Sequence, residues 1–179
     1  MGHPDFAGGQ TTMTDQEALG DRSETQPVPN YIASHIRPPA VAGTFLAVAA
    51  GLHFLLPQLR LINFPLRLLG AGFVPAGIAV MLWAVSYCEK KGTTHDTQAE
   101  PTELVTNGPF AASRNPMYLS MTAQLLGVAI FVGTIPFFLV PLAFWLTMAL
   151  VFVPAEERQL TDQFGTSWSE YCSRVRRWL

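Results

Sequence analysis

The feature that most constrains this chain is a long run without charged side chains, residues 115–155. A helix of about 20 apolar residues crosses the hydrocarbon core of a bilayer, which is about 30 Å thick. The run is therefore long enough for two crossings. Gly133, Thr134 and Pro136 lie near its midpoint, where a tight turn between two helices is expected. The run predicts a helical hairpin in a membrane, with both of its ends at the same surface.

Charged residues stand at both ends of this predicted hairpin. Arg114 precedes it, and Glu156, Glu157 and Arg158 follow it. Because the chain crosses the membrane and returns, the two charged clusters are expected to lie close together at one membrane surface. The functional interpretation depends on this predicted proximity of Arg114 and Glu157.

The composition also indicates an integral membrane protein. Hydrophobic residues make up 49% of the 179 residues and charged residues 13%, about half the share usual in soluble domains. The formal net charge of -2 gives no electrostatic basis for binding nucleic acid. Cys88 and Cys172 are too few for a disulfide framework and form no metal-binding motif, so no metal is expected.

Two further apolar stretches precede the hairpin, at residues 38–56 and residues 68–88. With the hairpin they predict an all-α integral membrane protein with about four transmembrane helices. The third helix is expected to begin at Pro116, with Asn115 as its N-cap. His53 is the sole titratable residue of the first stretch, and we expect a hydrogen-bonded or snorkelling histidine near the far surface.

The remaining charges predict the domain organisation and the orientation. Residues 1–29 are acidic and polar and are expected to form a disordered tail, followed by a single membrane domain, residues 30–179. Four crossings leave only Arg60 and Arg67 on one side. By the positive-inside rule, the other side and both termini are expected to face the cytoplasm. The lysines and arginines of that side are Arg22, Arg37, Lys90, Lys91, Arg114, Arg158, Arg174, Arg176 and Arg177.

The C-terminal residues have a different pattern. Residues 155–164 predict a short helix that Gly165 ends, and a capping-box spacing after the glycine predicts a last helix. We expect these helices to lie in the headgroup region or to fold over a site, without crossing the membrane. Arg174 and Arg177 are expected on one face of the last helix. Its apolar face is expected to carry Trp168, Tyr171, Cys172, Val175 and Trp178.

The two charged clusters favour a polar pocket next to lipid. Arg114 stands beside a helix N-terminus, and this combination favours a carboxylate or a phosphate. Glu156 and Glu157 are suited to hydroxyls, amines or a sulfonium. Such a pocket fits a water-soluble reagent that meets a lipophilic acceptor. The alternative is that Arg114 only contacts lipid phosphates and that the glutamates only stabilise a helix start.

Two motifs flank the hairpin. The motif before it comprises Gly92-Thr93-Thr94, Leu104-Val105-Thr106-Asn107-Gly108-Pro109-Phe110 and Arg114-Asn115-Pro116-Met117-Tyr118-Leu119. The motif after it comprises Glu156-Glu157-Arg158, Leu160, Phe164-Gly165, Tyr171, Arg174-Val175 and Trp178. Together, in this order and at this spacing, they resemble the isoprenylcysteine carboxyl methyltransferase family, over about residues 60–179. That family belongs to a wider group that includes the phospholipid N-methyltransferases.

The resemblance implies a membrane methyltransferase that uses S-adenosylmethionine, with C-terminal interfacial helices covering a cytosolic cofactor pocket. It also implies a lipophilic or small acceptor that enters from the bilayer. Arg114 and Glu157 are the implied catalytic residues: Arg114 to orient an anionic acceptor or the cofactor carboxylate, Glu157 to position the cofactor or act as a base. The residues implied in cofactor binding are Pro109, Phe110, Arg114, Asn115, Pro116, Tyr118, Leu119, Glu156, Glu157, Tyr171 and Arg174.

The chain departs from the family members that act on prenylated cysteine. Asn115 and Ser120 stand where those members usually have His and Gly, and asparagine donates hydrogen bonds but does not titrate. The motif with asparagine at position 115 resembles the small bacterial branch of the family, whose acceptors are diverse. A bacterial inner membrane is therefore the expected location. A carboxylate, thiol, amine or hydroxyl acceptor and any oligomeric state remain open.

Two other functional classes remain open. The membrane sterol reductases share this architecture and use NADPH, for which Lys90, Lys91 and His95 would offer contacts in the link before the hairpin. A non-enzymatic membrane subunit would have the same helices around a pocket that takes no ligand. Binding of S-adenosylhomocysteine or of NADPH separates the three classes.

Overall fold

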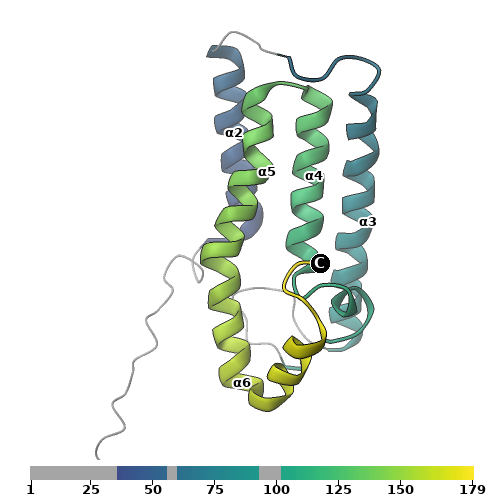
Figure 1. Ribbon diagram of the computed structural model, residues 1–179, viewed down its shortest axis with the longest axis vertical. Helices are drawn as coiled ribbons and strands as arrows, with labels where there is room; N and C mark the ends of the chain where they lie inside the picture. Colours follow the sequence, from purple (N-terminus) through teal and green to yellow (C-terminus); the bar gives the residue numbers. More distant parts are fainter. Residues whose placement is uncertain (1–35, 56–59, 93–101) are drawn as a thin grey trace, which may run out of the picture.

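The computed structural model describes residues 36–55, 60–92 and 102–179, and this part of the chain is all-helical. Four long helices stand side by side in Figure 1, in the order α2, α5, α4 and α3, and α6 continues below α5. The elements in chain order are α2 (Pro38–Leu55), α3 (Leu68–Lys90), the 3-10 helix η1 (Gly108–Ala111), α4 (Pro116–Val132), α5 (Ile135–Thr147), the π-helix η2 (Met148–Phe152) and α6 (Val153–Arg174).

The helices match the predicted membrane spans. α2, α3 and the continuous run Ile135–Arg174 are long and apolar enough to cross a membrane, and α4 is a shorter apolar helix. Large apolar side chains face outward, as expected for a surface in contact with lipid; Phe54 is 83% exposed and Leu150 72%. The all-α integral membrane fold is therefore confirmed. The predicted disordered tail, residues 1–29, lies outside the described residues.

The turn of the hairpin lies where the sequence predicts it. Gly133 ends α4 with a φ of 76°, a left-handed conformation that glycine adopts without steric cost, and its N–H donates to the carbonyl of Ala129. Arg67 Nε donates to the carbonyl of Phe131 over 2.5 Å, and Arg60 pairs with Thr134 through the backbone. The two arginines predicted to lie alone on one side of the membrane thus gather at the turn.

His53 lies at the same end of the molecule. Its Nδ1 is 3.1 Å from Thr134 Oγ1, and its ring makes edge contacts with Phe54 and Phe137. Thr134 itself is 1% exposed. The expectation of a hydrogen-bonded histidine is confirmed.

The fourth span continues into α6 without a break. The helix passes from α5 through η2 into α6, and Pro154, which has no N–H to donate, follows directly after the π-helical turn. Residues 155–164 therefore continue the helix of the fourth span, and the prediction of a separate short helix there is wrong. The break comes at Gly165, at φ 49° and ψ -115°, as predicted. The last helix ends at Arg174, and Val175 is extended. The predicted helical stripe through Val175 and Trp178 is therefore wrong.

The residues after α6 pack back onto the bundle. The ring of Trp178 lies 5.7 Å from the ring of Trp145, and Trp178 packs against the buried core around Phe144, Met148 and Phe152. Figure 1 accordingly shows the C-terminus beside the lower end of α4. Burial of an aromatic side chain stabilises this packing of the extended segment on the bundle.

Helices α3 and α4 approach each other through glycines. A Cβ added to Gly70 would lie 2.6 Å from Phe131 N, and one added to Gly127 would lie 2.9 Å from Gly70 O. The two backbones are in direct contact at this point, which is the arrangement that small residues permit between membrane helices. This contact holds the start of α3 against the end of α4, next to the hairpin turn.

We predict that Gly70→Ala lowers the stability of the protein and that Gly72→Ala does not. Overpacking at Gly70 costs about 1–3 kcal/mol, whereas a Cβ at Gly72, on the same helix, meets nothing within 4 Å. Thermal unfolding in detergent measures the difference, with a lower Tm for Gly70→Ala alone. Equal Tm values for the two variants would contradict the close helix contact.

Candidate functional site

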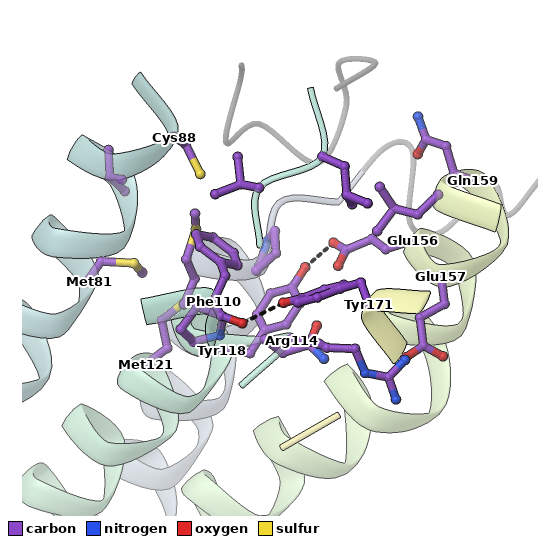
Figure 2. A pocket seen from close by; sticks show the side chains of 18 of the residues that line it. Met81, Cys88, Phe110, Arg114, Tyr118, Met121, Glu156, Glu157, Gln159 and Tyr171 are labelled. Atoms are coloured by element: carbon purple, nitrogen blue, oxygen red, sulfur yellow. Dashed lines mark hydrogen bonds and ion pairs between the residues drawn. The ribbon is translucent and has the colours of Figure 1, made fainter. Parts of the chain in front are cut away.

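A cavity of about 500 Å³ lies where α3, α4 and α6 converge, at the end of the molecule opposite the hairpin turn. Figure 2 shows its labelled side chains approaching from these three helices, from η1 and, for Arg114, from the turn before α4. The lining residues include Arg37, Pro38, Pro39, Met81, Val85, Cys88, Glu103, Leu104, Val105, Phe110, Arg114, Asn115, Pro116, Met117, Tyr118, Met121, Glu156, Glu157, Gln159, Leu160, Trp168 and Tyr171.

Arg114 lies between η1 and the N-terminus of α4, with 15% of its side chain exposed. Its Nη1 is 3.1 Å from Glu157 Oε1 and 2.8 Å from Cys172 Sγ. Its guanidinium carbon is 5.7 Å from the centre of the Trp168 ring, a distance typical of a cation–π contact. The predicted meeting of Arg114 and Glu157 across the hairpin is confirmed.

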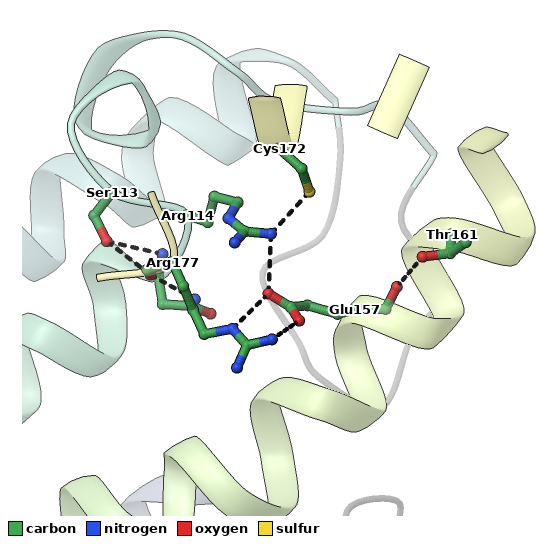
Figure 3. A network of polar contacts seen from close by, with 7 residues as sticks. Ser113, Arg114, Glu157, Thr161, Cys172 and Arg177 are labelled. Carbon is green, nitrogen blue, oxygen red and sulfur yellow. Dashed lines mark hydrogen bonds and ion pairs between the residues drawn. The ribbon is translucent and has the colours of Figure 1, made fainter. Parts of the chain in front are cut away.

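Glu157 is shared by two guanidinium groups (Figure 3). Besides Arg114, Arg177 binds it in a bidentate manner, with Nε 3.0 Å from Oε1 and Nη2 2.5 Å from Oε2. Only 17% of the Glu157 side chain is exposed, so these contacts compensate for much of its lost hydration. This contact was not predicted from the sequence, because Arg177 was expected on the polar face of a last helix that in fact ends at Arg174.

The C-terminal segment also binds the turn before α4 through its backbone. The carbonyl of Arg176 accepts from the Arg114 N–H over 3.0 Å. The carbonyl of Arg177 accepts from Asn115 Nδ2 over 2.9 Å and from Ser113 Oγ over 3.3 Å. Asn115 occupies the N-cap position of α4 as predicted, but its side chain makes no capping hydrogen bond and binds this carbonyl instead. Pro116 begins the helix as predicted.

Glu156 lines the cavity away from the contacts of Arg114, Glu157 and Arg177. A crossing that begins at Ile135 is complete after about 20 residues, so Glu156 lies beyond the membrane-spanning part. The hydroxyl of Tyr118 donates to Glu156 Oε1. Burial raises the pKa of Glu156 to about 7, with the Tyr118 hydrogen bond acting in the opposite direction and the Glu157 charge in the same one. Near neutral pH the Glu156 carboxyl group therefore exchanges a proton.

Tyr171 joins the last helix to η1. Its hydroxyl donates to the carbonyl of Phe110 over 2.7 Å, and its ring lies 5.6 Å from the ring of Trp168. Burial raises the pKa of Tyr171 to about 12, although the Arg114 charge opposes this. The hydroxyl thus remains a hydrogen-bond donor at neutral pH. Together Phe110, Trp168 and Tyr171 give the cavity an aromatic wall.

The wall opposite the aromatic one is apolar, and it was not predicted from the sequence. It is formed by Met81, Val85 and Cys88 of α3 and by Met117 and Met121 of α4. In the sequence, these residues do not differ from others in the apolar spans. Only the packing of α3 against α4 shows which of them reach the cavity.

Most residues that the family resemblance implicated line the cavity, and three do not. Pro109 is buried within η1, and Leu119 is one position past Tyr118 on α4 and so points about 100° away from it. Arg174 is exposed, and its Nε is 3.3 Å from the carbonyl of Glu170. The residues that line the cavity are Phe110, Arg114, Asn115, Pro116, Tyr118, Glu156, Glu157 and Tyr171.

Two of the three basic residues considered for NADPH do not line this cavity. Lys90 and Lys91 are exposed at the end of α3 and do not line it, and His95 lies outside the described residues. Across residues 36–55, 60–92 and 102–179, no three His, Cys, Asp or Glu side chains are grouped to hold a metal ion.

Comparison with known proteins identifies one family. Residues 66–167, more than half of the chain, match the sequence model of the phospholipid methyltransferase family. The match extends from the residue before Arg67 to the residue before Trp168, and thus includes Arg114 and Glu157. No curated protein and no solved structure matches the chain.

We predict that Glu157→Gln releases the C-terminal segment. A neutral amide leaves Arg114 and Arg177 close together without the carboxylate that separates them. A loss of about 1 kcal/mol corresponds to roughly fivefold faster cleavage of the opened segment. Brief trypsin treatment followed by mass spectrometry of the C-terminal peptides measures this rate. The control is Asp162→Asn, an exposed position on the same helix; equal cleavage of both variants would contradict the role of Glu157.

Proposed function

The chain belongs to the phospholipid methyltransferase family, and from this premise we propose that it transfers a methyl group from S-adenosylmethionine to a lipophilic or small acceptor. The observation that carries the proposal is the arrangement of the cavity. One side presents Arg114, Glu156 and Glu157, and the other is formed by apolar side chains of α3 and α4. A polar donor and an apolar acceptor need these two surroundings side by side.

The residues present fit the polar part of S-adenosylmethionine. The Nε of Arg114 is buried and has no hydrogen-bond partner, so a ligand carboxylate would satisfy it. Glu156 lines the same cavity and would favour the amino group and the sulfonium of the donor. The aromatic wall of Phe110, Trp168 and Tyr171 offers stacking surfaces for an adenine ring. A cavity of about 500 Å³ is within the usual range for cofactor-sized ligands.

Bound S-adenosylmethionine would supply an activated methyl group for displacement in line with the acceptor. The protein's part is to align the two reactants and to exclude water. Arg114 would orient the donor through its carboxylate. Glu157, held by two arginines, would position Arg114. Glu156 is the better candidate for a base, because its pKa of about 7 matches proton transfer near neutral pH.

The acceptor would occupy the apolar part of the cavity. Met81, Met117 and Met121 are flexible and polarisable, and such side chains adapt to apolar ligands of different shape. The distribution of arginines and lysines favours a cavity on the cytoplasmic side, together with both termini. A bacterial inner membrane is the proposed location.

A labelled-methyl assay tests the proposed function. Purified protein in detergent or vesicles is incubated with methyl-labelled S-adenosylmethionine and lipid extracts. We expect label in a lipid-soluble product whose mass exceeds that of its precursor by one methylene group. Oxidation of NADPH with an unsaturated lipid, without transfer of label, would contradict the proposal and favour a reductase.

We predict that Arg114→Ala weakens donor binding, because it removes the cation beside the N-terminus of α4. Loss of a charge-assisted hydrogen bond lowers the affinity roughly tenfold or more. Equilibrium dialysis with labelled S-adenosylmethionine measures this affinity. The control is Arg60→Ala, which removes an exposed arginine at the opposite end of the molecule. If both variants bind the donor like the parent protein, Arg114 has no role in binding.

We predict that donor affinity rises with pH through about 7 and that Glu156→Gln abolishes this rise. Burial holds Glu156 partly protonated, and a bound sulfonium stabilises its ionised form, so deprotonation favours binding. The charged groups that also line the cavity are Arg37, Glu103, Arg114 and Glu157. A bound-state pKa lower by about one unit gives a roughly fivefold change in the dissociation constant between about pH 6 and about pH 8. Calorimetry measures the dissociation constant at each pH. A pH-independent affinity in the parent protein would contradict the role of Glu156.

A further inference from the structure

The C-terminal segment, residues 175–179, brings a second arginine into the ionic part of the cavity. We infer that Arg177 is a positioning residue for the donor carboxylate, and that it acts through Glu157 on Arg114. This inference rests on the proposed function. It assigns a role to a residue outside the motifs of the family resemblance and outside the matched residues 66–167.

The contacts support an indirect role. Arg177 occupies both oxygens of Glu157, whereas Arg114 contacts one of them through Nη1. Arg177 is 44% exposed and does not line the cavity, whereas Arg114 is 15% exposed and does. Figure 3 shows the Glu157 side chain between the two guanidinium groups. A ligand in the cavity would therefore meet Arg114, with Glu157 and Arg177 behind it.

The charges explain why a second arginine is needed. Arg114 and Glu157 alone form a neutral pair, and a neutral pair attracts a further carboxylate only weakly. With Arg177 the cluster carries one net positive charge; Arg114 and Glu157 are largely buried, and solvent partly screens the more exposed Arg177. The Nε of Arg114 is a buried donor in this cluster that has no hydrogen-bond acceptor. Arg177 thus keeps Arg114 available for an incoming anion.

The segment is anchored by contacts that do not involve the Arg177 side chain. Its carbonyls bind Ser113, Arg114 and Asn115, and Trp178 packs on Trp145. Unlike Glu157→Gln, a substitution of Arg177 leaves the Arg114–Glu157 pair intact and no two arginines facing each other, so it is expected to leave the segment in place. Arg176 offers a matched control, because it is the adjacent arginine and its side chain is exposed.

The test compares two ligands that differ in the carboxylate. S-adenosylhomocysteine carries the amino-acid group, whereas 5′-methylthioadenosine lacks it and keeps the nucleoside and the thioether. We expect Arg177→Ala to weaken S-adenosylhomocysteine roughly tenfold and to leave 5′-methylthioadenosine within about twofold of the parent protein. Arg176→Ala should change neither dissociation constant. Calorimetry on the full chain in detergent measures all of them.

A conservative variant keeps the test independent of folding. Arg177→Lys retains the charge but loses the bidentate geometry, so it should restore part of the affinity for S-adenosylhomocysteine. An equal loss for both ligands, in either variant, would show a merely structural role and overturn the inference. So would unchanged affinity for S-adenosylhomocysteine in Arg177→Ala. If the parent protein binds neither ligand, the proposed function itself fails, which is a different result.

Discussion

The carboxylate of Glu157 is the group on which the arrangement of the site depends. It is largely buried and binds Arg114 from the start of the hairpin and Arg177 from the end of the chain. A charge so placed is destabilising unless it is paired and hydrogen-bonded, and the two guanidinium groups meet that need together. Three segments far apart in sequence, around Arg114, Glu157 and Arg177, are thereby held at one end of the molecule. The cavity is the space that they and α3 enclose.

The membrane explains why these segments meet at all. A chain that crosses a bilayer and returns must bring its two ends to the same surface, and Gly133 permits the tight turn that this requires. The contact of Gly70 with Gly127 then sets α3 beside α4, which supplies the apolar wall. A donor with charged groups could thus stay on the polar side of the cavity, and an acceptor from the lipid phase on its apolar side, while the two approach each other.

The sequence was sufficient for those features that depend on local pattern. The spans, the turn at Gly133, the start of α4 at Pro116 and the break at Gly165 follow from hydrophobic runs and from the backbone preferences of glycine and proline. The proximity of Arg114 and Glu157 followed from the length of an uncharged run. Such contacts are easier to predict in membrane proteins, because the thickness of the bilayer sets the length of each spanning helix.

The sequence was not sufficient where tertiary contacts determine the local conformation. Helical periodicity was extended past Arg174, but burial of Trp178 against Trp145 favours an extended segment, which turns Arg177 toward Glu157. Asn115 has the right position for an N-cap, yet the carbonyl of Arg177 binds its amide. No local signal distinguishes the methionines of the cavity from those of a core. These features arise from contacts between segments that no apolar run and no capping pattern in this sequence indicates.

The most direct measurement of the central claim is a calorimetric titration of the purified chain in detergent with S-adenosylhomocysteine, and separately with NADPH. If the cavity holds the methyl donor, S-adenosylhomocysteine binds at one saturable site and NADPH produces no saturable heat. Saturable binding of NADPH, without binding of S-adenosylhomocysteine, would contradict the account.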